Sequence, residues 1–273
     1  MKFLITYGNQ NYQKAKERLI LEAHQTQQFD VIKAYGPEDL PPQITSNPLF
    51  MCEKGGGYWI WKSYIIHDML SQIKENDIII YVDAGCNLYP TDQWNHYFAI
   101  MQKYDLLAFR INCINKRFIK KDVIEYFTPN NGETWKHFYQ IAGDILFVKK
   151  TDFSLNFTLN WKELSSSNLV ADVPPERLAN ENKGFIGHRH DQAILTGLIY
   201  QHMSTHKIKI IWNDFESLRP GQAIHASRIS DHGKRSSDIQ QPFKQMIKAC
   251  FVLPLRSLRQ LFWELVNKYS RSI

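Results

Sequence analysis

The stretch from Asp77 to Asn87, DIIIYVDAGCN, constrains the fold more than any other part of the 273-residue chain. Ile78–Val82 is an unbroken run of β-branched and aromatic residues, and it stops at Asp83, Ala84 and Gly85. Such a run between turn residues predicts a strand buried on both faces, the central parallel strand of an α/β sheet. Ligands of open α/β sheets bind beyond the carboxyl ends of strands, where a carboxylate suits a metal ion and a phosphate. The alternative for Asp83 is a plain capping role in the next loop.

Composition places the chain among globular proteins of the cytoplasm. It is 44% hydrophobic, which is enough for a sizeable core in one large domain or two small ones. Its four cysteines are widely spaced without a CxxC pair, which favours reduced thiols and argues against a zinc module. The N-terminal MKFLITYGNQ turns polar too soon for a signal peptide, and no apolar run is long enough to span a bilayer.

The net charge of +6 is concentrated in the C-terminal tail. Residues 243–273 hold six Lys and Arg against one Glu, which gives the tail +5 and leaves +1 for the rest of the chain. A nucleic-acid partner is therefore not expected. Apolar residues recur at helical spacing on both sides of Pro254. Two short basic amphipathic helices joined at a proline predict an anchor on an anionic membrane surface. The alternative is a helix packed against the core or a dimer partner, and the oligomeric state stays open.

The chain opens with a βαβ pattern. Lys2–Thr6 and Phe29–Ala34 are expected to be strands, with an amphipathic helix between them. This arrangement predicts a nucleotide or phosphate ligand near the turn at Thr6, Tyr7 and Gly8. A GxGxxG fingerprint is missing there, which disfavours ordinary dinucleotide binding. Further alternation of helices and strands gives the expected fold class, a Rossmann-type α/β fold with a mostly parallel central sheet flanked by helices.

A glycine-rich and aromatic segment, KGGGYWIWK, covers residues 54–62. Its three glycines allow a sharp turn or close approach of the backbone to a ligand. Trp59 and Trp61 are two residues apart and cannot share one helix face, so we expect one in the core and one in a cleft, against a sugar ring. The alternative is that both only pack. Lys62 is placed to meet a phosphate, although a solvated lysine is the simpler interpretation.

Three later segments complete the set of candidate sites. QIAGD, residues 140–144, precedes a predicted strand, and its Gln140 and Gly143 suit a place where backbone approaches a sugar or acceptor. In GHRHDQAILTGL, residues 187–198, Asp191 and Gln192 fall in the first turn of a predicted helix, and His190 precedes them. The alternative for Asp191 is a carboxylate that only favours the helix N-terminus. DHGKR, residues 231–235, suits a pyrophosphate and metal site or a solvated polar loop.

These segments, in this order, resemble the motifs of GT-A-fold nucleotide-sugar glycosyltransferases. The likeness is greatest to the retaining group of glycogenin and lipopolysaccharide galactosyltransferases, and GGGYWIWK with YVDAG also resembles bacterial and viral polysaccharide transferases. It covers most of residues 1–235. In that group Asp83 matches the first acid of a DxD motif, Asp191 and Gln192 match a pair beside the anomeric carbon, and His232 matches a metal ligand. Gly85 stands where the second acid would be, which leaves the need for metal open.

The resemblance implies a UDP-sugar donor, a hexose transferred with retention to a glycan or lipid-linked glycan, and Mn²⁺ or Mg²⁺ held by Asp83 and His232. It implies a transferase domain over residues 1–240 and a membrane-surface or packing tail over 241–273. The predicted location is the inner face of the cell membrane. The predicted donor-binding residues are Thr6, Tyr7, Gly8, Lys62, Asp83, Ala84, Gly85, Lys234 and Arg235. The predicted sugar or acceptor contacts are Trp59, Trp61, Gln140, Gly143 and His190.

Two rival classes remain at this point. One is another nucleotide-dependent transferase, such as a nucleotidyltransferase, which would need a glycine-rich phosphate loop near the N-terminus, and Tyr7–Asn9 makes a poor one. The other is a non-catalytic glycan-binding or nucleotide-binding protein, or a membrane adaptor, which the missing second acid and the basic tail would suit. Measured release of UDP from UDP-sugars separates both from the transferase.

Overall fold

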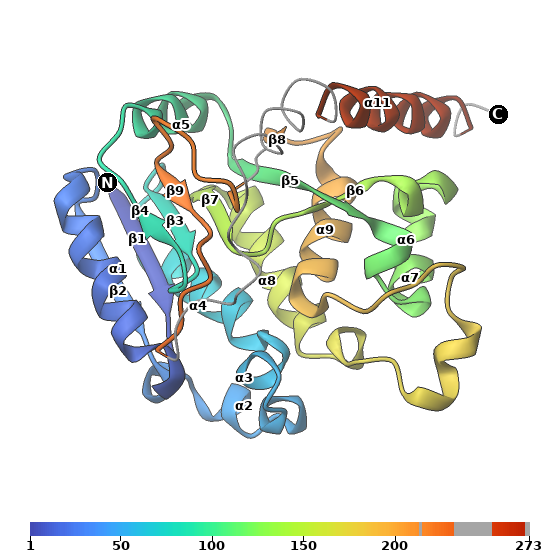
Figure 1. Ribbon diagram of the computed structural model, residues 1–273, viewed down its shortest axis with the longest axis horizontal. Coiled ribbons are helices and arrows are strands. Elements are labelled where there is room, and N and C mark those ends of the chain that lie inside the picture. Colours follow the sequence, from blue (N-terminus) through green and yellow to red (C-terminus); the bar gives the residue numbers. More distant parts are fainter. Residues whose placement is uncertain (213–214, 232–252, 271–273) are drawn as a thin grey trace.

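A computed structural model describes residues 1–212, 215–231 and 253–270 of the protein (Figure 1). The strands are β1 (Lys2–Tyr7), β2 (Val31–Tyr35), β3 (Ile78–Val82), β4 (Asn87–Leu88), β5 (Leu106–Ile114), β6 (Tyr139–Ile141), β7 (Ile145–Lys149), β8 (Ile208–Trp212) and β9 (Ile224–His225). The α-helices are α1 (Gln13–Thr26), α2 (Pro42–Thr45), α3 (Gly55–Tyr58), α4 (Ile60–Gln72), α5 (Gln93–Lys103), α6 (Asn115–Phe118), α7 (Lys121–Asn131), α8 (Asp152–Ser165), α9 (His190–His202) and α11 (Leu253–Ser270). Short 3-10 turns are η1 (Gln10–Tyr12), η2 (Pro37–Asp39), η3 (Pro48–Met51), η4 (Glu133–His137), η5 (Asn168–Val170) and η6 (Pro175–Asn180).

The main sheet has the order β2-β1-β3-β7-β5-β6, and β8 also pairs with β5. β1 pairs in parallel with β2 and β3, and β5 pairs in parallel with β8. β7 lies antiparallel between β3 and β5, and β6 is antiparallel to β5. Five strands therefore point one way and two the other, which confirms the expected mostly parallel sheet. The prediction for β3 needs one correction, because only its β1 side is parallel and its other neighbour, β7, is antiparallel.

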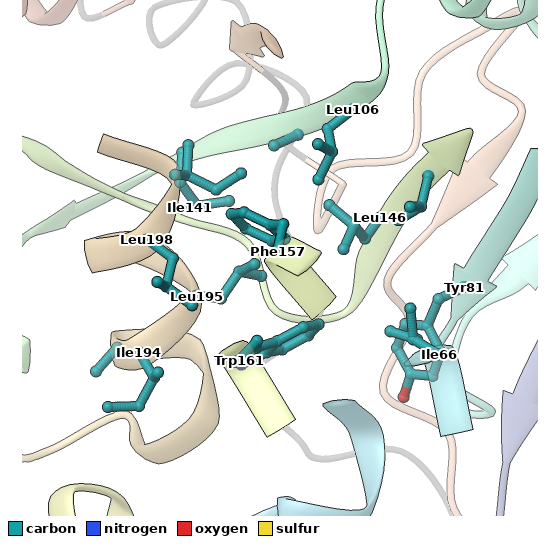
Figure 2. Close-up of a cluster of buried hydrophobic side chains, with 14 of the residues drawn as sticks. Ile66, Tyr81, Leu106, Ile141, Leu146, Phe157, Trp161, Ile194, Leu195 and Leu198 are labelled. Carbon is teal, nitrogen blue, oxygen red and sulfur yellow. The ribbon is translucent and has the colours of Figure 1, made fainter. Parts of the chain in front are cut away.

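Helices cover both faces of this sheet because its buried strands alternate their side chains between two cores. Leu4 points to the face that α1 and α5 cover, and Ile5 points to the opposite face. The second face is covered by α4, α8 and α9. Figure 2 shows the core on this second face, where Phe157 and Trp161 of α8 lie between α9 and the strands. Such alternation is what a pleated strand imposes when both faces are dry.

α9 is buried around most of its circumference, from His190 to Tyr200. It packs between α7, α8 and β6, so an amphipathic stripe would serve no purpose there. Gly197 allows this close packing, since a Cβ at that position would lie 2.3 Å from the ring of Phe127. The buried position of α9 fixes its first turn, and with it Asp191 and Gln192, against the end of the sheet.

α11 lies at the outer edge of the molecule, as Figure 1 shows, and packs against η4. Two of its polar side chains, Gln260 and Glu264, face the protein. Gln260 accepts a hydrogen bond from the Tyr139 amide at 3.0 Å, and Glu264 accepts one from Arg110 of β5 at 3.0 Å. The predicted tail helix beyond Pro254 is therefore confirmed, and it packs on the protein. The first predicted tail helix, from Phe243, lies outside the described residues.

Among the described residues, no helix is both long enough and apolar enough to cross a membrane. Cys52, Cys86 and Cys113, the cysteines within this part of the chain, are free thiols.

Candidate functional site

A cavity of about 930 Å³ opens at the edge of the sheet where β1, β3 and β8 end and β7 begins. Asp83 follows β3 and Asp144 precedes β7, and the Asp83 amide donates to the Asp144 carbonyl at 2.9 Å. The antiparallel β7 thus brings its start to the same edge as the carboxyl ends of the parallel strands. This is the edge where ligands of α/β sheets bind. The first turn of α9 and the segment around α3 form the other walls.

The floor of the cavity holds a buried ammonium group between carboxylates. Lys62 of α4 is only 3% exposed, and its Nζ donates to the Gly143 carbonyl at 2.7 Å. The same Nζ lies 3.2 Å from Asp83 Oδ1 and 3.5 Å from Asp191 Oδ2. Asp83 Oδ1 also accepts a hydrogen bond from the hydroxyl of Tyr81. The simple interpretation of Lys62 as a solvated lysine is therefore wrong, and the residue ties α4, β3 and α9 together.

Burial and mutual attraction set the charges of this cluster. Burial alone would lower the pKa of Lys62, but Asp191, Asp83 and Asp144 outweigh it and raise this pKa to about 12. Burial raises the pKa of Asp191 to about 6, with Lys62 opposing the rise and Asp83 adding to it. Burial also raises the pKa of Asp144 to about 6, and Asp83 adds to that rise. Lys62 stays charged at every physiological pH, whereas two carboxyl groups titrate near neutrality. Perturbed groups of this kind concentrate at functional sites.

Aromatic rings line one side of the cavity. The ring of Trp61 stacks on Tyr7 of β1 with centroids 3.8 Å apart, and its Nε1 donates to the Gly55 carbonyl at 3.0 Å. Trp59 stacks on His190 with centroids 5.4 Å apart. Trp61 is buried and Trp59 is half-buried, yet both contribute to the cavity wall. The expected division into one core tryptophan and one cleft tryptophan is therefore only partly met, because the two side chains differ in burial but both line the cavity.

The glycine segment adopts a backbone that other residues rarely adopt. Gly55, Gly56 and Gly57 have φ of +64°, +56° and +90°, and Trp59 also lies in the left-handed region. A Cβ at Gly55 would come within 2.3 Å of the Trp59 ring, and one at Gly57 within 2.6 Å of the Phe50 Cα. The three glycines therefore permit a tight coil that presents Trp59 to the cavity. They form no conventional phosphate loop.

The start of α9 places three of the expected residues. Asp191 and His190 line the cavity, and Gln192 does so beside Gly143. A Cβ at Gly143 would lie 3.0 Å from the Cβ of Gln192, so glycine permits this close approach. The Gln192 side chain donates to Gln140 Oε1 at 2.7 Å. Gln140 is fully buried and does not line the cavity itself, but its hydrogen bond positions the side chain of Gln192.

Two buried histidines and a lysine hold the loop that follows α8. His188 Nε2 pairs with the Leu169 carbonyl at 2.8 Å, and His190 Nδ1 pairs with the Val170 carbonyl at 2.7 Å. Lys120 Nζ donates to the carbonyls of Asn168 and Ala171. The four consecutive carbonyls of residues 168–171 are thus each bound by a side chain. Each histidine therefore has one ring nitrogen committed to a backbone carbonyl.

The segment from Ser227 to Asp231 crosses the end of β3. Ser227 Oγ and the Ile229 amide both donate to the Gly85 carbonyl, at 3.0 and 3.1 Å. Asp231 then accepts hydrogen bonds from the Lys14 and Ala15 amides, at 3.1 Å each, and so caps the N-terminus of α1. The start of DHGKR therefore does return to the sheet edge that carries Asp83. His232, Lys234 and Arg235 lie outside the described residues.

The other predicted residues divide into two groups. Tyr7, Gly8, Ala84 and Gly85 line the cavity with the residues already named. Thr6 is fully buried within β1 and does not line it.

The described residues hold no preformed site for a divalent cation. They contain no group of three or more His, Cys, Asp or Glu side chains arranged to hold a metal ion. The Asp83 oxygen that faces Lys62 is already used by an ammonium group and a hydroxyl. Mg²⁺ commonly takes only one or two ligands from a protein and completes its shell with waters and substrate phosphates, so the pairing of Asp83 with His232 would supply the usual protein share. The predicted pairing of Asp83 with His232 stays a prediction.

Two cavity residues carry no motif that would have marked them in the sequence. Asp144 lies within the quoted QIAGD segment, but only the strand order reveals that it adjoins Asp83. Arg228 lines the cavity and pairs with Glu216, and its φ of +53° is unusual for a residue other than glycine. Nothing in the sequence around Arg228 signals that backbone.

No protein-family model matches the sequence, and no curated protein sequence does. Several solved structures do align with the chain. A glycosyltransferase involved in the glycosylation of the major capsid of PBCV-1 aligns with a TM-score of 0.43 and 12% identity, over 80% of this chain and 83% of its own. A galactosyltransferase, LgtC, solved with donor and acceptor sugar analogues, aligns with a TM-score of 0.39 and 12% identity, over 79% and 74%. Mouse xyloside xylosyltransferase 1 aligns with a TM-score of 0.39 and 11% identity, over 79% and 86%.

These three structures are glycosyltransferases. At such identities and TM-scores, no donor, acceptor or residue role passes from them to this chain.

Proposed function

We propose that this protein transfers a hexose from a UDP-sugar to a glycan acceptor. The observation that carries the proposal is the buried Lys62 between Asp83 and Asp191 at the floor of an aromatic-walled cavity. A cavity of this size suits a ligand as large as a nucleotide sugar. Aromatic faces such as that of Trp59 suit sugar rings, and a fixed cation beside carboxylates suits a reaction that separates charge.

On the donor side, the bond between the anomeric carbon and the diphosphate oxygen breaks, and its electron pair leaves with UDP. The departing group gains negative charge, which a positive group fixed in a dry site stabilises without reorganisation. Lys62 is such a group, because three hydrogen-bonding or ionic partners hold it in place. Its raised pKa keeps it charged while the reaction proceeds.

On the sugar side, positive charge develops at the anomeric carbon, and the ionised Asp191 stabilises it. Gln192, held by Gln140, orients the sugar beside it. The acceptor hydroxyl oxygen forms the new bond to the anomeric carbon, and its proton passes to the departing diphosphate. The proposed stereochemical outcome is retention. It rests on the resemblance of the Asp191–Gln192 pair to that of retaining transferases.

The choice of UDP and of a hexose also rests on the motif resemblance. The proposed acceptor is a glycan, carried on a lipid during synthesis of surface polysaccharide or lipooligosaccharide. Support for a membrane setting comes from α11, whose outer face carries five exposed apolar side chains. Leu255, Leu258 and Phe262 are all more than half exposed, as are Leu261 and Leu265.

On a wheel of roughly 100° per residue, these five residues cover an arc of roughly 120°. The exposed Arg259 and Lys268 flank the arc on either side. Basic residues at the borders of an apolar arc suit a helix that lies in the surface of an anionic bilayer. We therefore propose that α11 binds the inner face of the cell membrane.

Release of UDP from a panel of UDP-hexoses tests the proposed function. We expect release to rise when a glycan acceptor is added, and we expect Asp191→Asn to lower it at least about a hundredfold. Lys121→Met is a matched control, because Lys121 forms only an exposed pair with Glu125 on α7. A protein that releases no UDP and binds none in calorimetry would not be a UDP-sugar transferase. Transfer of a nucleotidyl group instead would identify the rival enzyme class.

A further inference from the structure

The position of the missing second acid is closed by another part of the chain. A Cβ at Gly85 would lie 3.3 Å from the Cα of Arg228 and 3.4 Å from the carbonyl oxygen of Ile229. Two hydrogen bonds to the Gly85 carbonyl, from Ser227 and Ile229, hold that segment in place. A side chain at position 85 would require this backbone to shift by a few tenths of an ångström. The glycine is therefore part of the packing between β3 and the segment 227–229.

The segment that closes this position carries a positive charge. Arg228 lines the cavity and is half exposed, with Glu216 as its ion-pair partner. Its left-handed backbone, with φ of +53°, costs about 1–2 kcal/mol for a residue with a Cβ. Strain of this kind is retained where the surrounding structure enforces it, often at functional sites. Here it places an arginine directly against the end of β3.

A second cation, Lys62, lies against Asp83. Lys62 Nζ is 3.2 Å from Asp83 Oδ1, the oxygen that also accepts from Tyr81. Asp83 is thus held by protein donors, and its neighbourhood contains Lys62 and Arg228 where a DxD site would contain a second acid and a metal ion. Among residues 1–212, 215–231 and 253–270, Asp83 belongs to no group of three or more His, Cys, Asp or Glu side chains that could hold a metal ion.

We infer that the site binds a nucleoside diphosphate without a divalent cation, with Lys62 and Arg228 neutralising the diphosphate. This inference rests on the proposed function and deepens it. Arginine suits this role because its guanidinium group bonds two phosphate oxygens in one plane, and Lys62 adds a fixed point charge. Asp83 in this arrangement positions Lys62 and is not a metal ligand.

Calorimetric titration with UDP tests the inference. The protein is first treated with EDTA and then titrated in EDTA, and again in Mn²⁺ and in Mg²⁺. We expect the three dissociation constants to agree within about threefold. Arg228→Gly keeps the left-handed backbone without strain and removes only the side chain, so we expect UDP binding to weaken at least about tenfold. Arg228→Lys keeps the charge, so its affinity for UDP should lie between that of the unaltered protein and that of Arg228→Gly.

Arg177→Ala is the matched control, because Arg177 is about as exposed as Arg228 and also pairs with one acid, Asp122, but does not line the cavity. We expect it to bind UDP like the unaltered protein. Binding of UDP only in the presence of Mn²⁺ or Mg²⁺ overturns the inference and leaves the proposed function intact. Unchanged binding by Arg228→Gly overturns the role of Arg228. Failure to bind UDP under all three conditions overturns the proposed function itself.

Discussion

At the scale of single residues, Lys62 shows how burial and charge act together. Taking an ammonium group out of water costs several kcal/mol, and carboxylates repay this only when their geometry is good. Lys62 has the Gly143 carbonyl and two carboxylates within 3.5 Å. The three elements that meet there, α4, β3 and the first turn of α9, are fixed relative to one another by this contact. A cluster like this suits a site whose geometry must be rigid before the ligand arrives.

The shifted pKa of Asp191 makes a prediction about the pH dependence of activity. Burial raises this pKa to about 6, so the side chain is mostly neutral at pH 5 and mostly ionised at pH 7. The proposed chemistry requires the ionised form, so kcat/KM should rise as pH increases through about 6 and fall about tenfold per pH unit below it. The measurement is a profile of kcat/KM from pH 4.5 to 8 at constant ionic strength.

Asp144 has a similar pKa and a different place in the site, so its variant is the control for that profile. Asp144→Asn should keep the rising limb, whereas Asp191→Asn should lack it along with most of the activity. Carboxyl groups that interact titrate as a set, so the comparison of variants assigns the limb better than the curve alone. A flat profile in a protein that stays folded over this range would contradict the role given to Asp191.

At the scale of elements, the glycine segment before α4 positions an aromatic wall. Its three positive φ angles turn the chain so that Trp59 reaches His190 and Trp61 reaches Tyr7. The sequence signals a sharp turn here through its glycines. It does not signal that both tryptophans would meet the cavity, because the turn itself changes the directions in which residues 59 and 61 point.

Gly55→Ala should lower both stability and ligand binding. The left-handed backbone with an added Cβ costs about 1–2 kcal/mol, and the new methyl group would also collide with the Trp59 ring at 2.3 Å. Gly184→Ala is matched to it, because Gly184 also has a positive φ but nothing lies within 4 Å of its Cβ position. Urea denaturation and UDP titration of both variants make the comparison.

We expect Gly184→Ala to lose only the backbone contribution and to bind UDP normally. Gly55→Ala should lose more free energy of unfolding than Gly184→Ala and bind UDP more weakly. Equal stability and equal UDP affinity in the two variants would show that Trp59 tolerates displacement and that the coil does not position it.

At the scale of the whole molecule, the sequence predicts local features better than it predicts neighbours. The hydrophobic run of β3 and the helix that starts beside Asp191 follow from periodicity and turn residues, which act within a few positions. The antiparallel insertion of β7, which brings Asp144 to Asp83, depends on strand order and leaves no local trace. The same holds for the contact between Arg228 and Gly85, whose partners are 143 positions apart in the sequence.

α11 is the part of the molecule for which the sequence pattern is most ambiguous. Its apolar stripe predicts burial in a soluble protein and immersion in a membrane equally well. The structure turns Gln260, Glu264 and Asn267 toward the protein, where each has a hydrogen-bond partner. Packing on the protein and binding a membrane are therefore compatible, because different faces of the helix serve them.

Mutations on the two faces of α11 should affect different properties, membrane binding for the outer face and stability for the inner face. Leu258→Ser with Leu265→Ser removes exposed apolar area, so stability should change little, while co-sedimentation with phosphatidylglycerol-rich vesicles should fall at least about tenfold. Gln260→Ala removes the partner of the Tyr139 amide, so the free energy of unfolding should fall by about 1–3 kcal/mol while vesicle binding by the folded protein persists. Neutral vesicles should bind the unaltered protein more weakly, because Arg259 and Lys268 then lose their anionic partners. If the unaltered protein fails to sediment with anionic vesicles, or the double variant sediments equally well, the outer face of α11 has some other use and the membrane assignment is wrong.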